Sequence, residues 1–130
     1  MGATSVYLTN QILGHVFGKA TYSPPIIYVA LSLTDPLVDG SGLSEPVGGS
    51  YARVATASSD WDTPSGAVIY NAASIQFPIA TVSWGTIGWY AIMDSLTEGN
   101  LLSRGAVSPT VLVDVNNQFQ FDIGDLSVPL

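Results

Sequence analysis

The segment YVALSLTDPLVDGSGLSEPVGGSYARV, from Tyr28 to Val54, decides the fold class of this chain. Its beginning, with the preceding Ile26-Ile27, is rich in β-branched and aromatic residues, and Pro24-Pro25 before it disfavours a helix. The part from Thr34 to Ser50 holds four glycines, two prolines and three acidic residues, so it keeps no hydrophobic period. The segment therefore predicts a strand beginning near Ile26, a long surface loop and a second strand.

The rest of the chain continues with short β-prone runs, each bounded by Gly, Pro, Asp or Asn, and about six to eight strands are expected in all. After the first strand, the clearest runs are 51–56, 67–70, 74–77, 86–94, 101–106, 110–113, 118–121 and 126–128. Residues 119–123 alternate apolar with polar, as in a strand with one face on the core. Two packed sheets would bury this much apolar surface, so we expect a mainly β fold, a β-sandwich of jelly-roll type.

One helix is predicted before the strands. Thr4 or Ser5 can cap it and Gly18 can end it. Its apolar residues fall into two adjacent rows at helical spacing, namely Leu8, Ile12 and Val16, and Val6, Leu13 and Phe17. These rows either dock onto the sheet core or insert into a neighbouring subunit. Residues 1–130 are expected to form a single domain, with an N-terminal arm and helix over 1–18 and the β-sandwich over 26–130.

The composition points to a surface made for protein partners. Only 10% of the 130 residues are charged, against about 25% in typical globular domains, and the mean hydropathy is +0.36. Ten acids stand against Lys19, Arg53 and Arg104, and this balance leaves no basic patch for nucleic acid. The chain has no cysteine for a disulfide or a Cys-based metal site. No signal sequence or apolar membrane span is recognisable, so synthesis in a cytoplasm and no membrane partner are expected.

The sequence offers little support for catalysis. His15 is the only histidine, and its place near the end of the predicted helix suits a structural role. The nearest carboxylate pairs, Asp60/Asp62 and Asp35/Asp39, stand in no recognisable catalytic frame, and the spacing of a calcium loop is absent. We therefore expect no enzyme activity, cofactor or metal. Trp61 beside two acids keeps a carbohydrate-binding module open as an alternative, and a small hydrolase is the least supported one.

Several motifs together resemble a known family. They are T-D-P, D-G-S-G-L, E-P and G-G-x-Y-A-R within 34–53, the opening helix with Tyr22-Ser23-Pro24-Pro25, I-Q-F-P-I-A-T at 75–81, S-W-G-T-I at 83–87, and the glycines near 99–106. In these stretches the chain is similar to small bacteriophage virion proteins known as phage tail fibre proteins. The resemblance covers nearly the whole chain and implies a virion structural protein made in the host cytoplasm.

Two roles within that class remain open. A capsid cement or decoration protein, which binds the outer capsid surface and stabilises the shell through oligomeric contacts, is favoured because the chain is short and lacks a shaft-forming repeat. The alternative is a tail-fibre or tail-tip component involved in host receptor binding. By analogy, the expected partners are further copies of the chain in a homotrimer, and the major capsid protein or tail proteins.

The predicted partner contacts are the loop Thr34 to Ser50 and the N-terminal arm Met1 to Ser5. Each arginine is expected to pair with a carboxylate, either within the fold or across an interface, where a bidentate pair can dominate binding. The candidate contact residues are Asp35, Asp39, Leu43, Glu45, Arg53, Trp61 and Arg104.

Overall fold

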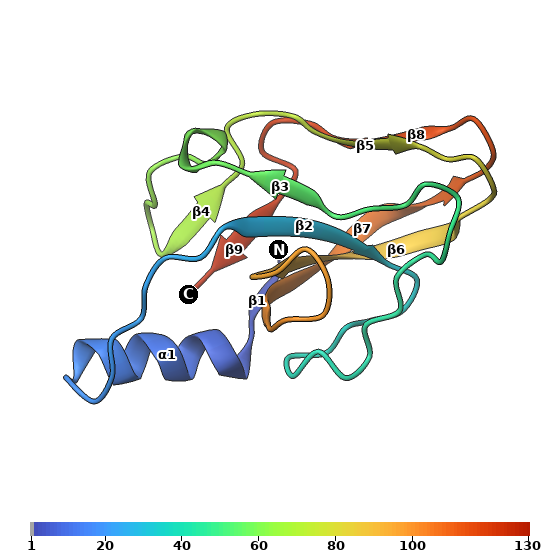
Figure 1. Cartoon of the computed structure of the whole chain (residues 1–130). Coiled ribbons are helices and arrows are strands. Elements are labelled where there is room, and N and C mark those ends of the chain that lie inside the picture. The colour runs from blue at the N-terminus through green and yellow to red at the C-terminus, as the bar shows by residue number, and fades with distance from the viewer. Residues whose placement is uncertain (1) are drawn as a thin grey trace.

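The computed structural model describes residues 2–130. The first residue of the predicted contact arm, Met1, lies outside the described residues. The model is mainly β, with one α-helix at the N-terminal end (Figure 1).

The helix α1 (Val6–Val16) forms where the sequence predicts it. The Oγ of Ser5 accepts a hydrogen bond from the Leu8 N–H at 3.0 Å, which satisfies one of the free donors of the first turn. Gly18, with φ of 73°, follows the C-cap and lets the chain leave the helix. The helix contains no fully buried residue, although Tyr7 and Leu8 pack against the core. The helix therefore docks onto the body of the protein through one side only, the side that carries Tyr7 and Leu8.

One layer is a five-stranded antiparallel sheet in the order β1-β7-β6-β2-β3. Its strands are β1 (Ala3–Thr4), β2 (Ile27–Ser32), β3 (Val54–Thr56), β6 (Gly85–Met93) and β7 (Leu101–Val113). The predicted strands 101–106 and 110–113 are one strand, because the ladder with β6 shifts register between Ile87 and Trp89 and continues beyond it. The predicted strand 51–56 begins only at Val54.

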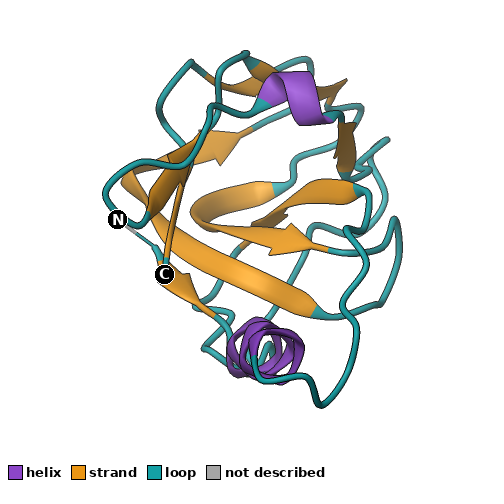
Figure 2. Ribbon diagram, turned by 90° about the vertical axis from the view of Figure 1, so that its left-hand side faces the viewer, coloured by secondary structure: helices purple, strands orange, loops and turns teal. Residues whose placement is uncertain are grey.

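The second layer consists of two separate two-stranded ribbons. β4 (Val68–Tyr70) pairs with β9 (Ser127–Pro129), and β5 (Ile75–Ile79) pairs with β8 (Gln118–Phe121). Figure 1 shows β5 and β8 running together along one edge of the view and β4 beside β9, and Figure 2 shows α1 end on, below the strands. The fold is thus sandwich-like, as predicted, while the jelly-roll strand arrangement is not confirmed.

The core between the layers is aromatic. Phe77 is 1% exposed, and its ring lies 5.9 Å from that of Phe119 and 6.2 Å from that of Phe121 in edge-on contacts. Phe119 and Phe121 point inward while Gln118 and Gln120 are exposed, which confirms the alternation read from this strand. The strand ends at Phe121, so the last residues of the predicted alternating segment lie in a turn.

The loop from Thr34 to Ser50 is present as predicted, and it is tied to its surroundings by main-chain hydrogen bonds. The Leu33 N–H donates to the Ser44 oxygen at 2.8 Å, and the Val6 N–H donates to the Val38 oxygen at 3.0 Å. The loop therefore lies against both the sheet and the beginning of α1.

The predicted contact arm is also part of the fold. Ala3 and Thr4 form β1 at the edge of the sheet, opposite Arg104 and Ser103 of β7, and the Thr4 hydroxyl bonds to the Pro129 oxygen. A strand of two residues leaves no periodic signal in a sequence, so this pairing could not be predicted.

Candidate binding surfaces

An ion pair between the buried Arg53 and the partly buried Glu45 joins the long loop to the sheet. The Glu45 carboxylate accepts hydrogen bonds from Nε and a terminal nitrogen of Arg53 at 2.9 and 2.8 Å, a bidentate geometry. The other terminal nitrogen of Arg53 donates to the main-chain oxygens of Ser95 and Glu98 at 2.8 Å each. The Tyr51 hydroxyl donates to Glu45 at 2.7 Å. This network links the loop, the residues before β3 and the β6–β7 turn.

The surroundings of this network keep the ion pair charged. Burial raises the pKa of the Glu45 carboxyl, but the hydrogen bonds from Arg53 and Tyr51 together outweigh it and hold the pKa below its ordinary value. Burial, followed by the hydrogen bond to Glu45, raises the pKa of Tyr51. Arg53 is only 8% exposed. Of the two readings open for Arg53, the structure shows the intrachain pair, and its predicted role as a partner contact stays untested.

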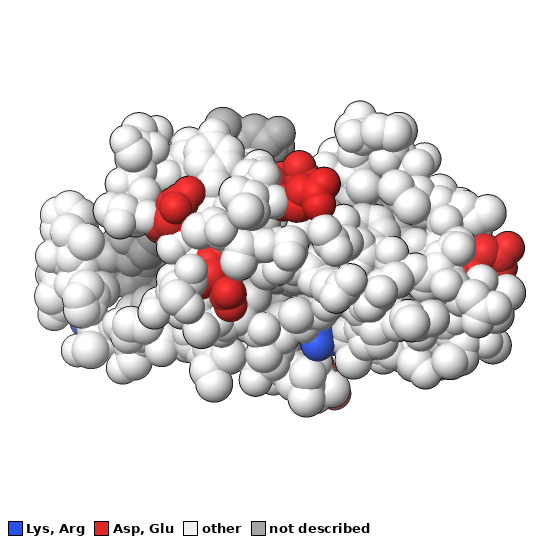
Figure 3. All heavy atoms as spheres, turned by 90° about the horizontal axis from the view of Figure 1, so that it is seen from above, with Lys and Arg blue, Asp and Glu red and all other residues white. Residues whose placement is uncertain are grey.

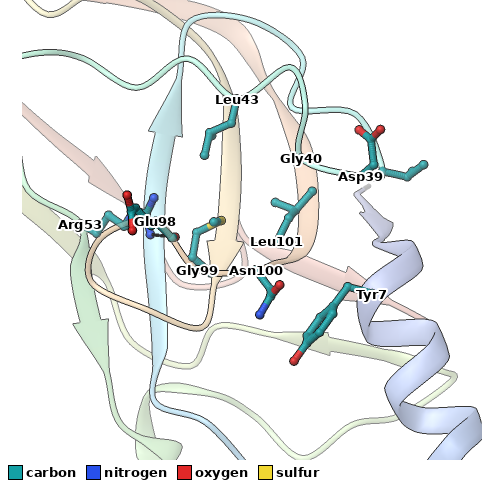
Figure 4. Close-up of a pocket in the computed structure, with 11 residues that line it drawn as sticks. Tyr7, Asp39, Gly40, Leu43, Arg53, Glu98, Gly99, Asn100 and Leu101 are labelled. Carbon is teal, nitrogen blue, oxygen red and sulfur yellow. Dashed lines mark hydrogen bonds between the residues drawn. The ribbon is translucent and has the colours of Figure 1, made fainter.

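A small pocket of about 190 Å³ lies beside Arg53, between the loop, the β6–β7 turn and the first turn of α1. Figure 4 shows Leu43 from the loop and Leu101 from β7 on its walls, with Asn100 and Tyr7 farther along. Leu43 packs against a buried cluster that includes Leu101. The pocket is smaller than the roughly 300–1,000 Å³ typical of small-molecule sites, so we assign it no ligand.

The second predicted arginine is held more loosely. Nε of Arg104 lies 3.5 Å from an oxygen of Asp35, and the guanidinium carbon lies 5.4 Å from the centroid of the Trp89 ring. Both members of the pair remain partly exposed. Asp35 also accepts a hydrogen bond from the Leu37 N–H at 2.9 Å. The pair thus holds the beginning of the loop over β6 and β7.

Asp39 is exposed at the tip of the loop and shapes a turn. Its carboxylate accepts hydrogen bonds from the N–H and the hydroxyl of Ser41 at 3.0 and 2.7 Å, and the main-chain bond is the larger cause of its lowered pKa. Asp39 therefore remains available to a partner, although its predicted contact role is untested.

Trp61 lies at the wall of an apolar groove and is half-buried there. Its Nε1 donates to the Thr56 hydroxyl at 2.9 Å, and its ring packs against the core. The groove has a volume of about 550 Å³ and lies between α1 and the β4–β9 ribbon. Its apolar lining is Leu8, Pro24, Pro25, Ile27, Ala57, Pro64, Ile69, Ile92, Leu102 and Val128, besides Trp61.

Sequence reasoning singled out Trp61 but missed this groove. The groove forms where the helix, the Pro-Pro segment and the C-terminal strand meet, and these parts are distant in sequence. The only usable signal was the unusual breadth of the apolar face of α1, which left the mode of helix docking open.

Two of the residues considered for chemistry, His15 and Asp60, have structural partners. Nδ1 of His15 accepts a hydrogen bond from the Tyr22 N–H at 3.2 Å, and the Asp60 carboxylate accepts one from the Ala57 N–H at 2.8 Å. Within residues 2–130, no cluster of three or more His, Asp or Glu side chains could hold a metal ion. No helix in that range is long and apolar enough to cross a membrane.

The surface carries few charges. Figure 3 looks down on β5 and β8 and shows separate acidic groups and little basic surface among uncharged atoms. Arg53 and Arg104 are both paired within the chain, whereas Lys19 is exposed and forms no ion pair with any residue from Gly2 to Leu130.

The family comparison agrees with the motifs in the sequence. A family model described as podophage GP4 fiber I protein gp80 matches residues 3–129. No curated protein matches the chain. The match spans almost the whole chain and confirms the resemblance to phage tail fibre proteins. This protein is a phage virion structural protein that belongs to the podophage GP4 fiber I protein family.

Proposed function

We propose that this chain is a structural subunit of a tail fibre that acts by binding other proteins and by taking part in contact with the host. The observation that carries this proposal is the fibre-family match over residues 3–129. A β-rich module with little surface charge suits assembly into a larger protein complex, since interface cores are depleted in charged residues.

The family comparison changes the balance between the two virion roles. Sequence reasoning favoured capsid cement because the chain seemed too short for a fibre. The family description names a fibre protein and thereby supports the tail-fibre alternative. No described surface feature of residues 2–130 argues specifically for a capsid partner, so we carry the tail-fibre role forward.

A non-catalytic role is part of the proposal. His15, Asp60 and Glu45 are each engaged in a hydrogen bond within the chain. A general acid or base needs a perturbed pKa within reach of a substrate in a cleft. Glu45 lines a cavity of about 370 Å³, but its carboxylate is engaged by Arg53 and Tyr51, and these hydrogen bonds hold its pKa below the ordinary value.

The number and position of copies in the virion test the proposal. Quantitative mass spectrometry of purified particles measures the ratio of this chain to the major capsid protein, and electron microscopy with a labelled antibody locates it. We expect a small number of copies, all on the tail. A ratio near one, or a simple fraction repeated over the shell, with label on the capsid, would reinstate the cement role.

Contact with the host has its own test. Antibody fragments against the isolated protein should lower the rate at which phage adsorb to cells if the fibre subunit meets the host surface. The matched control is a fragment against the major capsid protein at equal occupancy. Unchanged adsorption with a fully labelled tail would leave a purely structural role in the fibre.

A further inference from the structure

The outward face of α1 is apolar and has no cover within the chain. Leu13, Val16 and Phe17 are 51%, 68% and 72% exposed, and Val6 at the start of the same face is 52% exposed. At about 100° per residue these side chains lie within an arc of roughly 100°, the width of a helix face that normally packs on a core. Leu8, on the opposite side, supplies the contact with the body of the protein. Figures 1 and 2 show α1 lying at the edge of the molecule, beneath the sheet.

The same molecule carries an apolar groove of a size to receive such a face. Its volume of about 550 Å³ exceeds that of the pocket between the loop and α1, about 190 Å³, and that of the cavity beside Glu45, about 370 Å³, and Pro25, Ile69 and Val128 contribute apolar walls. Amphipathic helices commonly bind by placing side chains at spacings of three and four residues into a groove of this kind. Leu13, Val16 and Phe17 have that spacing.

The helix cannot fill the groove of its own copy. Leu8 of α1 already lines that groove, so the outward face of the helix points away from it. A second copy is therefore the source from which this face could enter the groove.

Charge also favours a second copy as the occupant. Each chain carries a net charge of −7, so copies repel unless their contact excludes acids or pairs them with cations. Asp62 is the only acid that lines the groove, and it forms no ion pair within residues 2–130. Lys19, just beyond the end of α1, is the cation that the fold leaves unpaired. The helix surface thus ends near a free cation and the groove carries a free acid, so the two surfaces are complementary in charge.

We propose that the chain self-associates by placing Leu13, Val16 and Phe17 of one copy into the groove of the next, with Lys19 beside Asp62. Because the two surfaces differ, the contact is heterologous unless a two-fold axis makes it reciprocal, and repetition of a heterologous contact closes a ring or extends a filament. This inference deepens the proposed fibre role by naming the partner of the subunit.

The first experiment measures the molar mass of the isolated protein by light scattering over a range of concentrations. Wild type should be oligomeric, and Leu13→Asp with Phe17→Asp should be monomeric with an unchanged circular dichroism spectrum. Val47→Asp is the matched control, because Val47 is 92% exposed and lines neither surface. A monomeric wild type, or an oligomer that survives in the double variant, would overturn the proposal.

A charge exchange tests the orientation and does not depend on apolar substitutions. Lys19→Glu should weaken self-association roughly fivefold to tenfold, and adding Asp62→Lys should restore it. If Asp62→Lys does not restore the association lost in Lys19→Glu, these two residues do not face each other and the proposed docking is wrong.

These outcomes are separate from the fibre role. The copy number in virions can still place the chain on the tail when the isolated protein fails to associate. A groove that binds a glycan or another virion protein in a monomeric wild type would also overturn self-association without touching the fibre assignment.

Discussion

Arg53 and Arg104 both fasten the loop 34–50 to the sheet, yet they work in different surroundings. The Arg53 side chain is 4% exposed and makes four hydrogen bonds, whereas the Arg104 side chain is 23% exposed and lies 3.5 Å from its acid without a hydrogen bond at Nε. Removing one member of a buried pair leaves the other charge away from water without a partner, which lowers stability strongly. Breaking an exposed pair changes the free energy of unfolding little, because water solvates both charges. Burial, more than pairing itself, should therefore decide what each arginine contributes to stability.

The largest expected effect comes from breaking the buried pair. Arg53→Ala should lower the free energy of unfolding by about 3 kcal/mol, because the partly buried Glu45 would lose its counter-charge and the main-chain oxygens of Ser95 and Glu98 would lose their donor. Urea denaturation followed by tryptophan fluorescence measures the change. The paired replacement of Glu45→Leu with Arg53→Met should recover much of the loss. A loss below about 1 kcal/mol, with weakened binding to other virion proteins, would instead support the partner-contact role predicted from sequence.

Removing only the hydroxyl of the network should have an intermediate effect. In Tyr51→Phe, Glu45 loses a donor, and the Leu31 N–H loses the acceptor that it contacts at 3.0 Å. Each is part-buried, so the expected loss is about 1–3 kcal/mol. The ring, which packs edge-on against Trp84 at 5.3 Å, remains in place, so the measured loss reflects the hydroxyl and not the aromatic packing. Equal stability of the two proteins by denaturation would mean that water replaces the hydroxyl.

The free energy of unfolding at acid pH should depend on the protonation of Glu45. Its pKa in the folded protein is lowered, so its contribution is complete above the ordinary pKa of about 4.3 and is lost as the pH falls through the lower folded value. The unfolding free energy of wild type should therefore fall more steeply below about pH 4.3 than that of Glu45→Gln. Denaturation curves of both proteins between neutral and acid pH test this, and parallel curves would contradict it.

The smallest effect is expected at the exposed pair. Arg104→Ala should cost about 1 kcal/mol or less, the sum of a partly exposed ion pair and a contact with the Trp89 ring. The ionic part of that loss should shrink in high salt. If denaturation instead shows a loss as large as for Arg53→Ala, the contrast between the two sites is wrong.

The aromatic core could be predicted from the sequence, whereas the groove could not. Phe119 and Phe121 alternate with glutamines, and that local period correctly placed both rings in the core. Ser5 and Gly18 correctly bounded the helix, because capping depends on residues within one turn. The glycines and prolines after Thr34 correctly predicted a loop.

Other features were beyond sequence reasoning because they depend on distant segments. β1 exists only through its pairing with β7, and the continuity of β7 through Pro109 depends on its ladder with β6, which continues past the register shift. The apolar rows of α1 looked equivalent in sequence, yet only Leu8 and its neighbours met the core. Val16 belongs to the row of Leu8 but faces outward with Leu13 and Phe17, because the way the helix is held against β7 decides which side chains are covered.

The β-rich class, the opening helix, the long loop and the family are all readable from the amino-acid sequence, since they rest on short periods, turn residues and linear motifs. Only the tertiary structure decided that Arg53 is buried, that Arg104 is not, and that a groove lies beside α1. The partners of Arg53 include main-chain oxygens 42 and 45 residues away. Burial and pairing depend on atoms that folding brings together from such distances, and no local pattern encodes them.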